Sequence, residues 1–335
     1  MKDDIKNQHH MNHVKDQHHD SVLVTLADKN YVNQVKQLFS SVYWNAGWSG
    51  DYLLLSHEIP EKDLLWFKKK GILVFKCKPL YKKRYYGSIN GCDLSKLYLF
   101  KPYFKNWKHI IFLDADIIVK SSLDGLKKNK GISVVPDGMK IMDNFKKNPV
   151  SLGLDKKYDL NSTGFNSGVI VLDSRMIEEG VFSDLKNMIK PYEPYVLYGI
   201  QPLLVFYFYK RWDSLPLMYN VEVQKLQNHY YLKEEKIKGV VLHFDGPGKP
   251  WKKESGFYKE WQNNLELAEK IDLKNIPPAA KIFSDNEMMR YQKYLQGRKI
   301  VRDAIKVNIS RSKYYVGRMI KSVSPRFYYY LGGQN

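Results

Sequence analysis

Short β-rich runs alternate with stretches of helical spacing along most of this chain, and this alternation limits the fold more than any other feature. Seven runs are expected to form strands: Ser21–Leu26, Asp51–Leu55, Gly71–Lys76, His109–Leu113, Gly131–Val135, Gly168–Leu172 and Gly239–Phe244. Helical spacing is found between them in Val32–Tyr43, Lys62–Lys70 and Asp93–Phe104. Because the runs are apolar almost throughout, both faces of the sheet must be covered, which is typical of a mostly parallel sheet flanked by helices. The sequence therefore predicts an α/β fold.

Ligands of such sheets lie beyond the carboxyl ends of the strands, so the residues that follow each run are the first candidates for chemistry. Asp114-Ala115-Asp116 directly follows the run that ends at Leu113. Two carboxylates this close repel each other unless a cation neutralises them, and their oxygens suit Mg²⁺ or Mn²⁺. A turn with two solvated acids is the alternative for this motif taken alone.

A second motif, His243–Trp251, follows the run that begins at Gly239. A neutral imidazole can complete an oxygen-rich metal site, glycines let the backbone approach an anion, and Lys249 can meet a phosphate. The alternative is a Gly/Pro turn with a surface lysine. A third motif, Thr163–Gly168, either binds sugar hydroxyls through its small polar residues or only shapes a turn.

Taken together, these motifs resemble glycosyltransferase family 8, the retaining nucleotide-sugar transferases that include glycogenin and bacterial lipopolysaccharide galactosyl- and glucosyltransferases. The resemblance runs from about Ser21 to Trp261, with the motifs in the family's order. It implies a GT-A-type, Rossmann-like fold and a UDP-sugar donor. It also implies dependence on Mn²⁺, with Mg²⁺ as the alternative ion.

The resemblance implies roles for individual residues. The metal ligands would be Asp114, Asp116 and His243. Contacts to the UDP-sugar donor would come from Leu26, Asp28, Tyr31, Lys96, Ala115, Ser167, Gly246 and Lys249, with Ser167 in the donor-sugar loop. Gln201 and Asn166 would be the catalytic residues beside the donor sugar, and Tyr219-Asn220 resembles a further family segment.

One segment departs from the family's pattern. The family usually has Asp-Gln where this chain has Ile200-Gln201, and usually Asn where it has Val205. One hydroxyl contact to the donor sugar is therefore missing or supplied from elsewhere. The sequence shows no obvious nucleophilic carboxylate beside Gln201, so we expect front-side attack by the acceptor hydroxyl. The acceptor itself is not predicted, because Asp137–Asp159, expected to be a variable loop, carries no recognisable motif.

The two ends of the chain differ from its centre. Residues 1–20 are polar and His-rich and are expected to be a disordered arm, 21–275 to form the transferase domain, and 276–335 to form a basic helical appendage. Residues 275–335 carry 12 Lys+Arg against 3 Asp+Glu, with apolar stripes at Ile300–Ile309 and Val316–Val323. Docking to anionic lipid and simple solvation of a surface helix are both open interpretations. Nucleic-acid binding is disfavoured, because the net charge of +19 comes without a recognised nucleic-acid-binding module.

The sequence also bears on location. Its apolar runs stop short of the ~20 residues of a membrane span, and its N-terminus has no apolar signal core. Cys77 and Cys92, the only two cysteines, cannot build a disulfide framework. We therefore expect a cytoplasmic protein, with peripheral contact to the membrane through its basic C-terminal region.

Three functions are compatible with these features. The first is a retaining enzyme that moves a hexose from UDP-glucose or UDP-galactose to a glycan, a lipid-linked saccharide or a protein. The second is a glycogenin-like self-glucosylating protein, since the chain has 25 tyrosines as acceptors. The third is a non-catalytic UDP-sugar or glycan-binding protein. An oligomer is compatible with all three.

Overall fold

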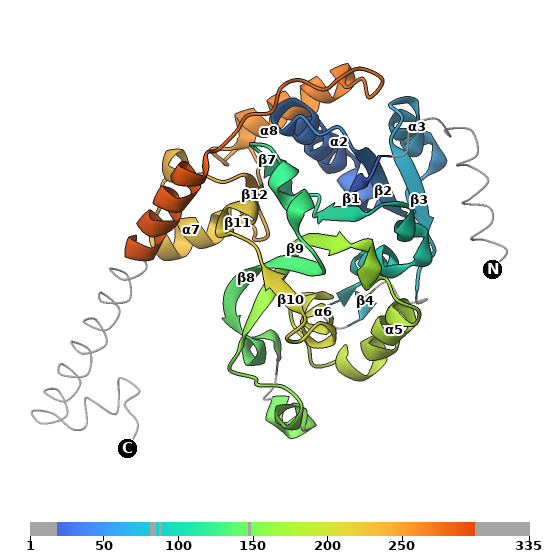
Figure 1. The fold of residues 1–335 in the computed structure, drawn as a ribbon, viewed down its shortest axis with the longest axis vertical. Helices are drawn as coiled ribbons and strands as arrows, with labels where there is room; N and C mark the ends of the chain where they lie inside the picture. Colours follow the sequence, from blue (N-terminus) through green and yellow to red (C-terminus); the bar gives the residue numbers. More distant parts are fainter. Residues whose placement is uncertain (1–18, 81–84, 87–88, 147–148, 299–335) are drawn as a thin grey trace, which may run out of the picture. The chain divides into compact units, whose positions relative to one another are not determined.

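The computed structural model describes residues 19–80, 85–86, 89–146 and 149–298 (Figure 1). They divide into two compact units. The larger unit holds the described residues up to Gln224 together with Lys238–Phe283, and the smaller unit holds Lys225–Ile237 and residues 284–298. The predicted arm up to residue 18 and the predicted apolar stripes of residues 300–323 lie outside the described residues.

The main sheet of the larger unit has seven strands. In the order β10-β8-β9-β6-β1-β2-β3, they are β10 (Trp212–Ser214), β8 (Ile132–Lys140), β9 (Thr163–Asp173), β6 (His109–Leu113), β1 (Ser21–Ala27), β2 (Asp51–His57) and β3 (Leu73–Cys77). Strand β9 runs antiparallel to its neighbours β6 and β8, whereas the other paired strands run parallel. The mostly parallel central sheet predicted from the sequence is confirmed.

Two smaller sheets accompany it. One has the order β11-β12-β7, with β11 (Val221–Glu222), β12 (Val241–His243) and β7 (Ile117–Val119), and the other pairs β4 (Tyr85–Tyr86) with β5 (Ile89–Asn90). The run predicted at 239–244 therefore forms a strand outside the main sheet, contrary to expectation. The reason is that the chain leaves the main sheet after β6. The next strand, β7, follows Asp116 and pairs antiparallel with β12.

Helices flank the main sheet. They are α2 (Val32–Ser41), α3 (Glu61–Lys69), α4 (Gly91–Leu94), α5 (Val181–Tyr192), α6 (Gln201–Tyr207) and α8 (Tyr258–Leu267). In the smaller unit, most of α7 (Val223–Tyr230) and residues 285–298 are also helical. The single helix predicted over 93–104 is wrong: α4 passes into 3₁₀ turns at Ser95–Phe100 and Pro102–Asn106. Pro102 explains why the two 3₁₀ turns are separate, because a residue before proline, here Lys101, favours an extended backbone. Across the described part of the chain, none of the helices combines the length and hydropathy of a membrane-spanning segment.

Both faces of the sheet are covered, as the apolar runs predicted. All seven residues of β1 are buried. On one face, Val22 and Val24 belong to a large apolar cluster with residues of α5, α6 and the 3₁₀ turns after α4. On the other face, Phe39 of α2 packs edge-to-face on Tyr52 of β2 and on Phe67 of α3. This core fixes the strand ends that carry the polar residues.

Two strands extend further than the sequence indicated. Strand β8 continues past Val135 to Lys140 through register shifts against β9, and β9 begins at Thr163 instead of Gly168. Asp137, Asn166 and Ser167 therefore lie in strands, although turns or loops were expected. Because β9 is antiparallel, its first half lies at the edge of the sheet where β6 ends, and Asp114 N donates to Gly168 O at 2.8 Å.

Candidate active site

Two carboxylates and an imidazole lie close together at the end of β6, the start of β7 and the end of β12. Asp114 follows the last residue of β6, and Asp116 precedes β7. The backbone oxygen of Asp116 accepts a hydrogen bond from Phe244 N at 3.0 Å. This bond and the pairing of β12 with β7 bring His243 beside the acidic pair.

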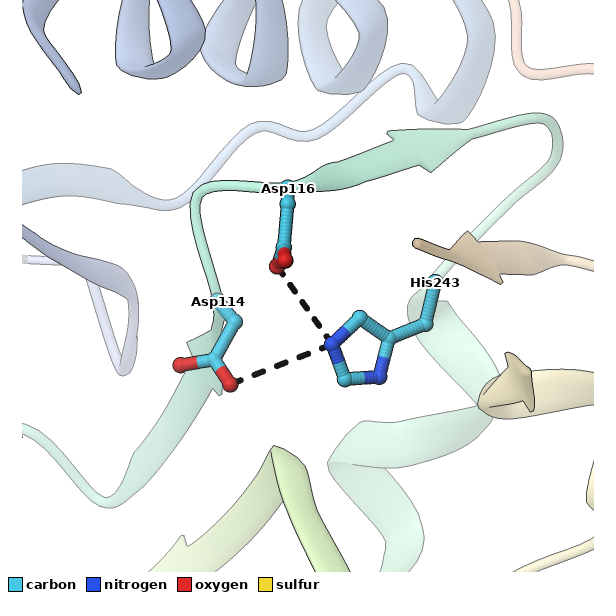
Figure 2. Close-up of side chains that lie close together, drawn as sticks. All are labelled: Asp114, Asp116 and His243. Carbon is cyan, nitrogen blue, oxygen red and sulfur yellow. Dashed lines mark ion pairs between the residues drawn. The ribbon is translucent and has the colours of Figure 1, made fainter. Parts of the chain in front are cut away.

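The three side chains form one compact cluster. The His243 Nε2 lies 3.3 Å from Asp116 Oδ1 and 4.0 Å from Asp114 Oδ2. Figure 2 shows the same ring nitrogen facing both carboxylates. One ligand atom from each residue lies within 4.8 Å of the others, and His243 is buried. The residues predicted as metal ligands are thus brought together.

A hydrogen-bonded chain orients the imidazole. His243 Nδ1 lies 3.0 Å from Asn220 Oδ1, and Asn220 Nδ2 donates to Asn166 Oδ1 at 2.8 Å. Asn166 Oδ1 also accepts from Gly168 N at 2.8 Å. Because an amide oxygen only accepts, Nδ1 carries a proton, and loss of the Nε2 proton would leave a lone pair directed at the carboxylates.

This donor set fits a divalent cation. Two carboxylates and one oriented imidazole suit an ion that takes mixed oxygen and nitrogen ligands, and three protein ligands leave positions for phosphate oxygens. The structure gives Asn220 a larger part than the sequence indicated. In the sequence, the only feature that pointed to Asn220 was the weak resemblance of Tyr219-Asn220 to a family segment.

Two lysines neutralise the acidic pair. Lys96 Nζ lies 2.9 Å from Asp114 Oδ1 and donates to Ser167 O at 3.1 Å. Lys249 Nζ lies 2.6 Å from Asp116 Oδ2 and donates to Phe244 O at 2.5 Å. Both lysines were predicted to contact the donor, and the structure places both beside the carboxylates.

Burial and charge shift the pKa values of the cluster in opposite directions. Burial by itself raises the pKa of Asp116, but the neighbouring His243 and Lys249 outweigh it and hold that pKa below its ordinary value. Burial lowers the pKa of His243, but Asp116, followed by Asp245 and Asp114, outweighs it and raises the value to about 9. Without a bound cation, the imidazole is therefore protonated at neutral pH.

Gln201 is held on both sides of its amide. Its Oε1 accepts from Ser167 N at 3.0 Å, and its Nε2 donates to Asp137 Oδ2 at 3.3 Å. All three residues are buried. The structure thus places a carboxylate beside Gln201, which the sequence did not indicate. Pro136-Asp137-Gly138 has the composition of a turn, and only pairing with β9 makes it part of a strand.

The remaining predicted residues lie at the carboxyl end of β1 and on the loop after β12. Leu26 is in β1, and Asp28 caps the short helix Lys29–Tyr31 by accepting from Asn30 N at 2.8 Å. The Tyr31 ring packs edge-to-face on Trp251, with ring centroids 5.8 Å apart. Lys249 Nζ lies 5.7 Å from the Trp251 ring centroid, so the aromatic pair adjoins the lysine.

Two small residues complete the set. Ala115, between the two metal-ligand candidates, is 6% exposed. Gly246 lies against the side chain of Gln224, whose Oε1 accepts from Gly248 N at 3.3 Å. The roles of these residues toward the donor stay predictions.

The fold and the site define the class: the chain has the GT-A fold of glycosyltransferases, with an Asp-x-Asp pair after a central strand. A profile described as glycosyl transferase family 8 matches residues 22–255. The chain belongs to this family, which confirms the resemblance seen in the sequence. A search of curated protein sequences finds no match.

Solved structures share this fold. The bifunctional glycosyltransferase WbbM aligns with a TM-score of 0.57 at 18% identity, over 77% of this chain and 52% of WbbM. GlyE of Streptococcus pneumoniae aligns with a TM-score of 0.54 at 18% identity, over 79% of this chain and 66% of GlyE. The galactosyltransferase LgtC, solved with donor and acceptor sugar analogs, aligns with a TM-score of 0.57 at 16% identity, over 75% of this chain and 96% of LgtC. The alignment thus spans about half of the WbbM chain and about two thirds of GlyE.

Proposed function

We propose that this glycosyltransferase is a retaining enzyme that moves a hexose from a UDP-sugar to a hydroxyl group, with Mn²⁺ as its ion. UDP-glucose and UDP-galactose are the first donors to test. The acceptor is a glycan, a lipid-linked saccharide or a protein. The observation that carries this proposal is the cluster of Asp114, Asp116 and His243, with Lys96 and Lys249 in contact with its carboxylates.

The site has what the departure of a diphosphate needs. Negative charge grows on the leaving phosphate as the anomeric bond lengthens, and fixed positive groups stabilise it. Asp114, Asp116 and His243 would hold a divalent cation that supplies Lewis acidity to the diphosphate. Lys249 lies close enough to Asp116 to bind the same phosphates through its ammonium group.

The sugar end of the site is formed by amides. The reacting sugar becomes oxocarbenium-like, and Gln201 and Asn166 are the polar side chains proposed to face its ring. Front-side attack by the acceptor hydroxyl, with the departing phosphate taking its proton, requires no protein nucleophile. Isolation of a covalent glycosyl-enzyme would refute this part of the mechanism.

The decisive experiment is a panel of UDP-sugars assayed for Mn²⁺-dependent release of UDP. We expect turnover with at least one donor, and loss of about 100-fold or more in Asp116→Ala, because one of three metal ligands is removed. Asp213→Ala, an exposed carboxylate on β10, is the matched control and should keep full activity. UDP release from no donor in the panel would sink the proposal.

The same samples separate the alternatives. Intact-mass spectrometry after incubation with UDP-glucose and Mn²⁺ reveals self-glucosylation as a ladder of hexose additions. UDP binding without metal-dependent turnover of any donor would instead indicate a non-catalytic binding protein.

We also propose that the basic segment from residue 276 onward brings the enzyme to anionic lipid at the cytoplasmic membrane face. Its excess of Lys and Arg beside apolar residues supports this. Sedimentation with phosphatidylglycerol vesicles, compared with phosphatidylcholine vesicles, tests it. Equal recovery on both would contradict it.

A further inference from the structure

Position 200 contributes no polar group to the site. Ile200 is 3% exposed and belongs to the apolar cluster beneath the sheet, together with Leu203 and Leu204 of α6. Its neighbours on either side along the chain, Gly199 and Gln201, carry no charge. Any charged contact to the donor sugar at this end of the site would therefore come from another element.

The backbone just before Gln201 is held in an unusual conformation. Tyr198 and Gly199 are consecutive residues with left-handed φ angles of 58° and 63°. This conformation costs energy for a non-glycine residue such as Tyr198, and such costs are characteristic of functional sites. The turn presents the Gly199 backbone to a neighbouring segment.

That neighbouring segment carries Asp93. A β-carbon at Gly199 would lie 3.2 Å from Asp93 Oδ2, so the carboxylate packs directly on the backbone next to Ile200. Lys96, Asp114 and Asp116 are the charged groups that act on Asp93 most strongly. Asp93 therefore interacts with the charged groups of the active site, and its carboxylate contacts the turn that leads into Gln201.

Asp93 also has hydrogen-bonding capacity to spare. Among the described residues, its one hydrogen bond comes from Asn90 N, at 3.3 Å to Oδ2, as part of the capping box of α4. A carboxylate accepts up to about four hydrogen bonds. Burial raises the pKa of Asp93 to about 6, with Lys96 lowering it in part, so the group is mainly ionised at pH 7.

We propose that Asp93 accepts a hydrogen bond from a ring hydroxyl of the donor sugar, and that this contact sets which hexose the enzyme uses. The inference rests on the proposed function. A sugar hydroxyl is a donor of the kind that an under-used, half-buried carboxylate binds well. A site built around such a contact discriminates strongly against a sugar that cannot make it.

The test compares UDP with UDP-sugars, because only the sugar would reach Asp93. In Asp93→Asn, with Mn²⁺ present, we expect calorimetric affinity for UDP to stay within about twofold and affinity for the preferred UDP-sugar to fall about tenfold, as for loss of a hydrogen bond to a charged group. The kcat/KM ratio between UDP-glucose and UDP-galactose should change at least about fivefold. Asp93→Ser, which also lacks the charge, should show the same changes in affinity and donor ratio as Asp93→Asn.

Donors that lack one ring hydroxyl identify the contact. With the donor deoxygenated at the hydroxyl that Asp93 binds, Asp93→Asn should cause no further loss, whereas the other deoxy donors should still lose about tenfold. Glu287→Gln is the control for helix capping, because Glu287 accepts from Ser284 N at 2.9 Å in a similar cap of another helix. It should leave donor selectivity unchanged.

The outcomes are distinguishable. If the wild-type protein releases UDP from no donor, the proposed function fails and this inference with it. If the wild type is active but Asp93→Asn weakens UDP and UDP-sugar equally, or leaves the donor ratio unchanged, Asp93 has only its capping role and the inference alone is overturned.

Discussion

The His243 ring lies against the α-carbon of Gly168, so closely that a β-carbon at position 168 would overlap the ring and come 2.6 Å from Nδ1. The same β-carbon would lie 2.9 Å from Asn166 Oδ1, the group that holds Asn220 in place. The absence of a side chain on one residue of β9 therefore decides where the imidazole can stand. Its distance to the two carboxylates depends on that position.

Replacing this glycine should weaken metal binding without removing any ligand. In Gly168→Ala the ring must shift from the position in which it faces Asp114 and Asp116, so Mn²⁺ affinity should fall by about 10–100-fold, as for other changes that disturb ligand orientation. Calorimetric titration with Mn²⁺ measures it. Gly164→Ala, on the same strand and with only ordinary contacts of 3.6 Å to Val205, is the control. Equal Mn²⁺ affinity in both variants would contradict the prediction.

Lys249 should lower the affinity of the site for Mn²⁺ and raise its affinity for the nucleotide. Its ammonium lies 2.6 Å from Asp116 Oδ2, where it competes with a cation for the same carboxylate. In Lys249→Met, affinity for Mn²⁺ alone should rise several-fold, whereas affinity for UDP in saturating Mn²⁺ should fall by about tenfold. Lys252→Met, a nearby exposed lysine, should change neither. A fall in both affinities would show that Lys249 does not compete with the ion.

Metal affinity should depend on pH through His243. The pKa of this imidazole is about 9 without the ion, because Asp116 and its acidic neighbours outweigh the effect of burial. A metal ligand must be deprotonated, so Mn²⁺ affinity should rise by up to about tenfold per pH unit and level off near pH 9. Titrations at pH 6.5, 7.5 and 8.5 measure the slope. A flat profile would mean that His243 is already neutral.

The stability of the protein without added metal should follow the opposite trend. A histidine whose pKa is raised by folding stabilises the fold fully below its unfolded value of about 6.5, and this contribution is lost as the pH rises through about 9. The melting temperature of the wild type should therefore decline over this range relative to His243→Gln. Parallel pH profiles of the two proteins would contradict this.

Asp137 should position Gln201 for catalysis. A carboxylate can only accept, so Asp137 requires that Gln201 Nε2 point toward it and Oε1 toward Ser167 N. In Asp137→Asn the charged acceptor of Nε2 is lost, and only the Ser167 N–H donor still fixes the amide, so the Gln201 side chain is held less firmly. We expect kcat to fall by about tenfold with UDP affinity unchanged. Asp213→Asn on the neighbouring strand β10 is the control, and an unchanged kcat in Asp137→Asn would overturn the assignment.

The chemistry of the metal site could be predicted from short motifs. Asp114-Ala115-Asp116 and His243 each follow or end an apolar run, and carboxylates and imidazole in such places indicate a cation site. Their closeness could not be predicted from the runs alone. This closeness depends on the pairing of β7, which lies outside the main sheet, with β12. The two strands are far apart in the chain.

The surroundings of Gln201 were harder to predict. Asp137 stands in a Pro-Asp-Gly sequence that has turn composition, and Asp93 lies in a segment whose spacing suggested one continuous helix. Register shifts between β8 and β9 bring Asp137 beside Gln201. The left-handed turn at Tyr198-Gly199 contacts Asp93.

The sequence by itself determined where seven of the strands and the first two helices lie and the kinds of ligand at the metal site, because hydrophobic periodicity and ligand chemistry are properties of short segments. Only the tertiary structure decided which carboxylates face Gln201, Gly199 and Lys96. Those contacts follow from strand register, bulges and turns, which are set when segments distant in the chain pack against one another.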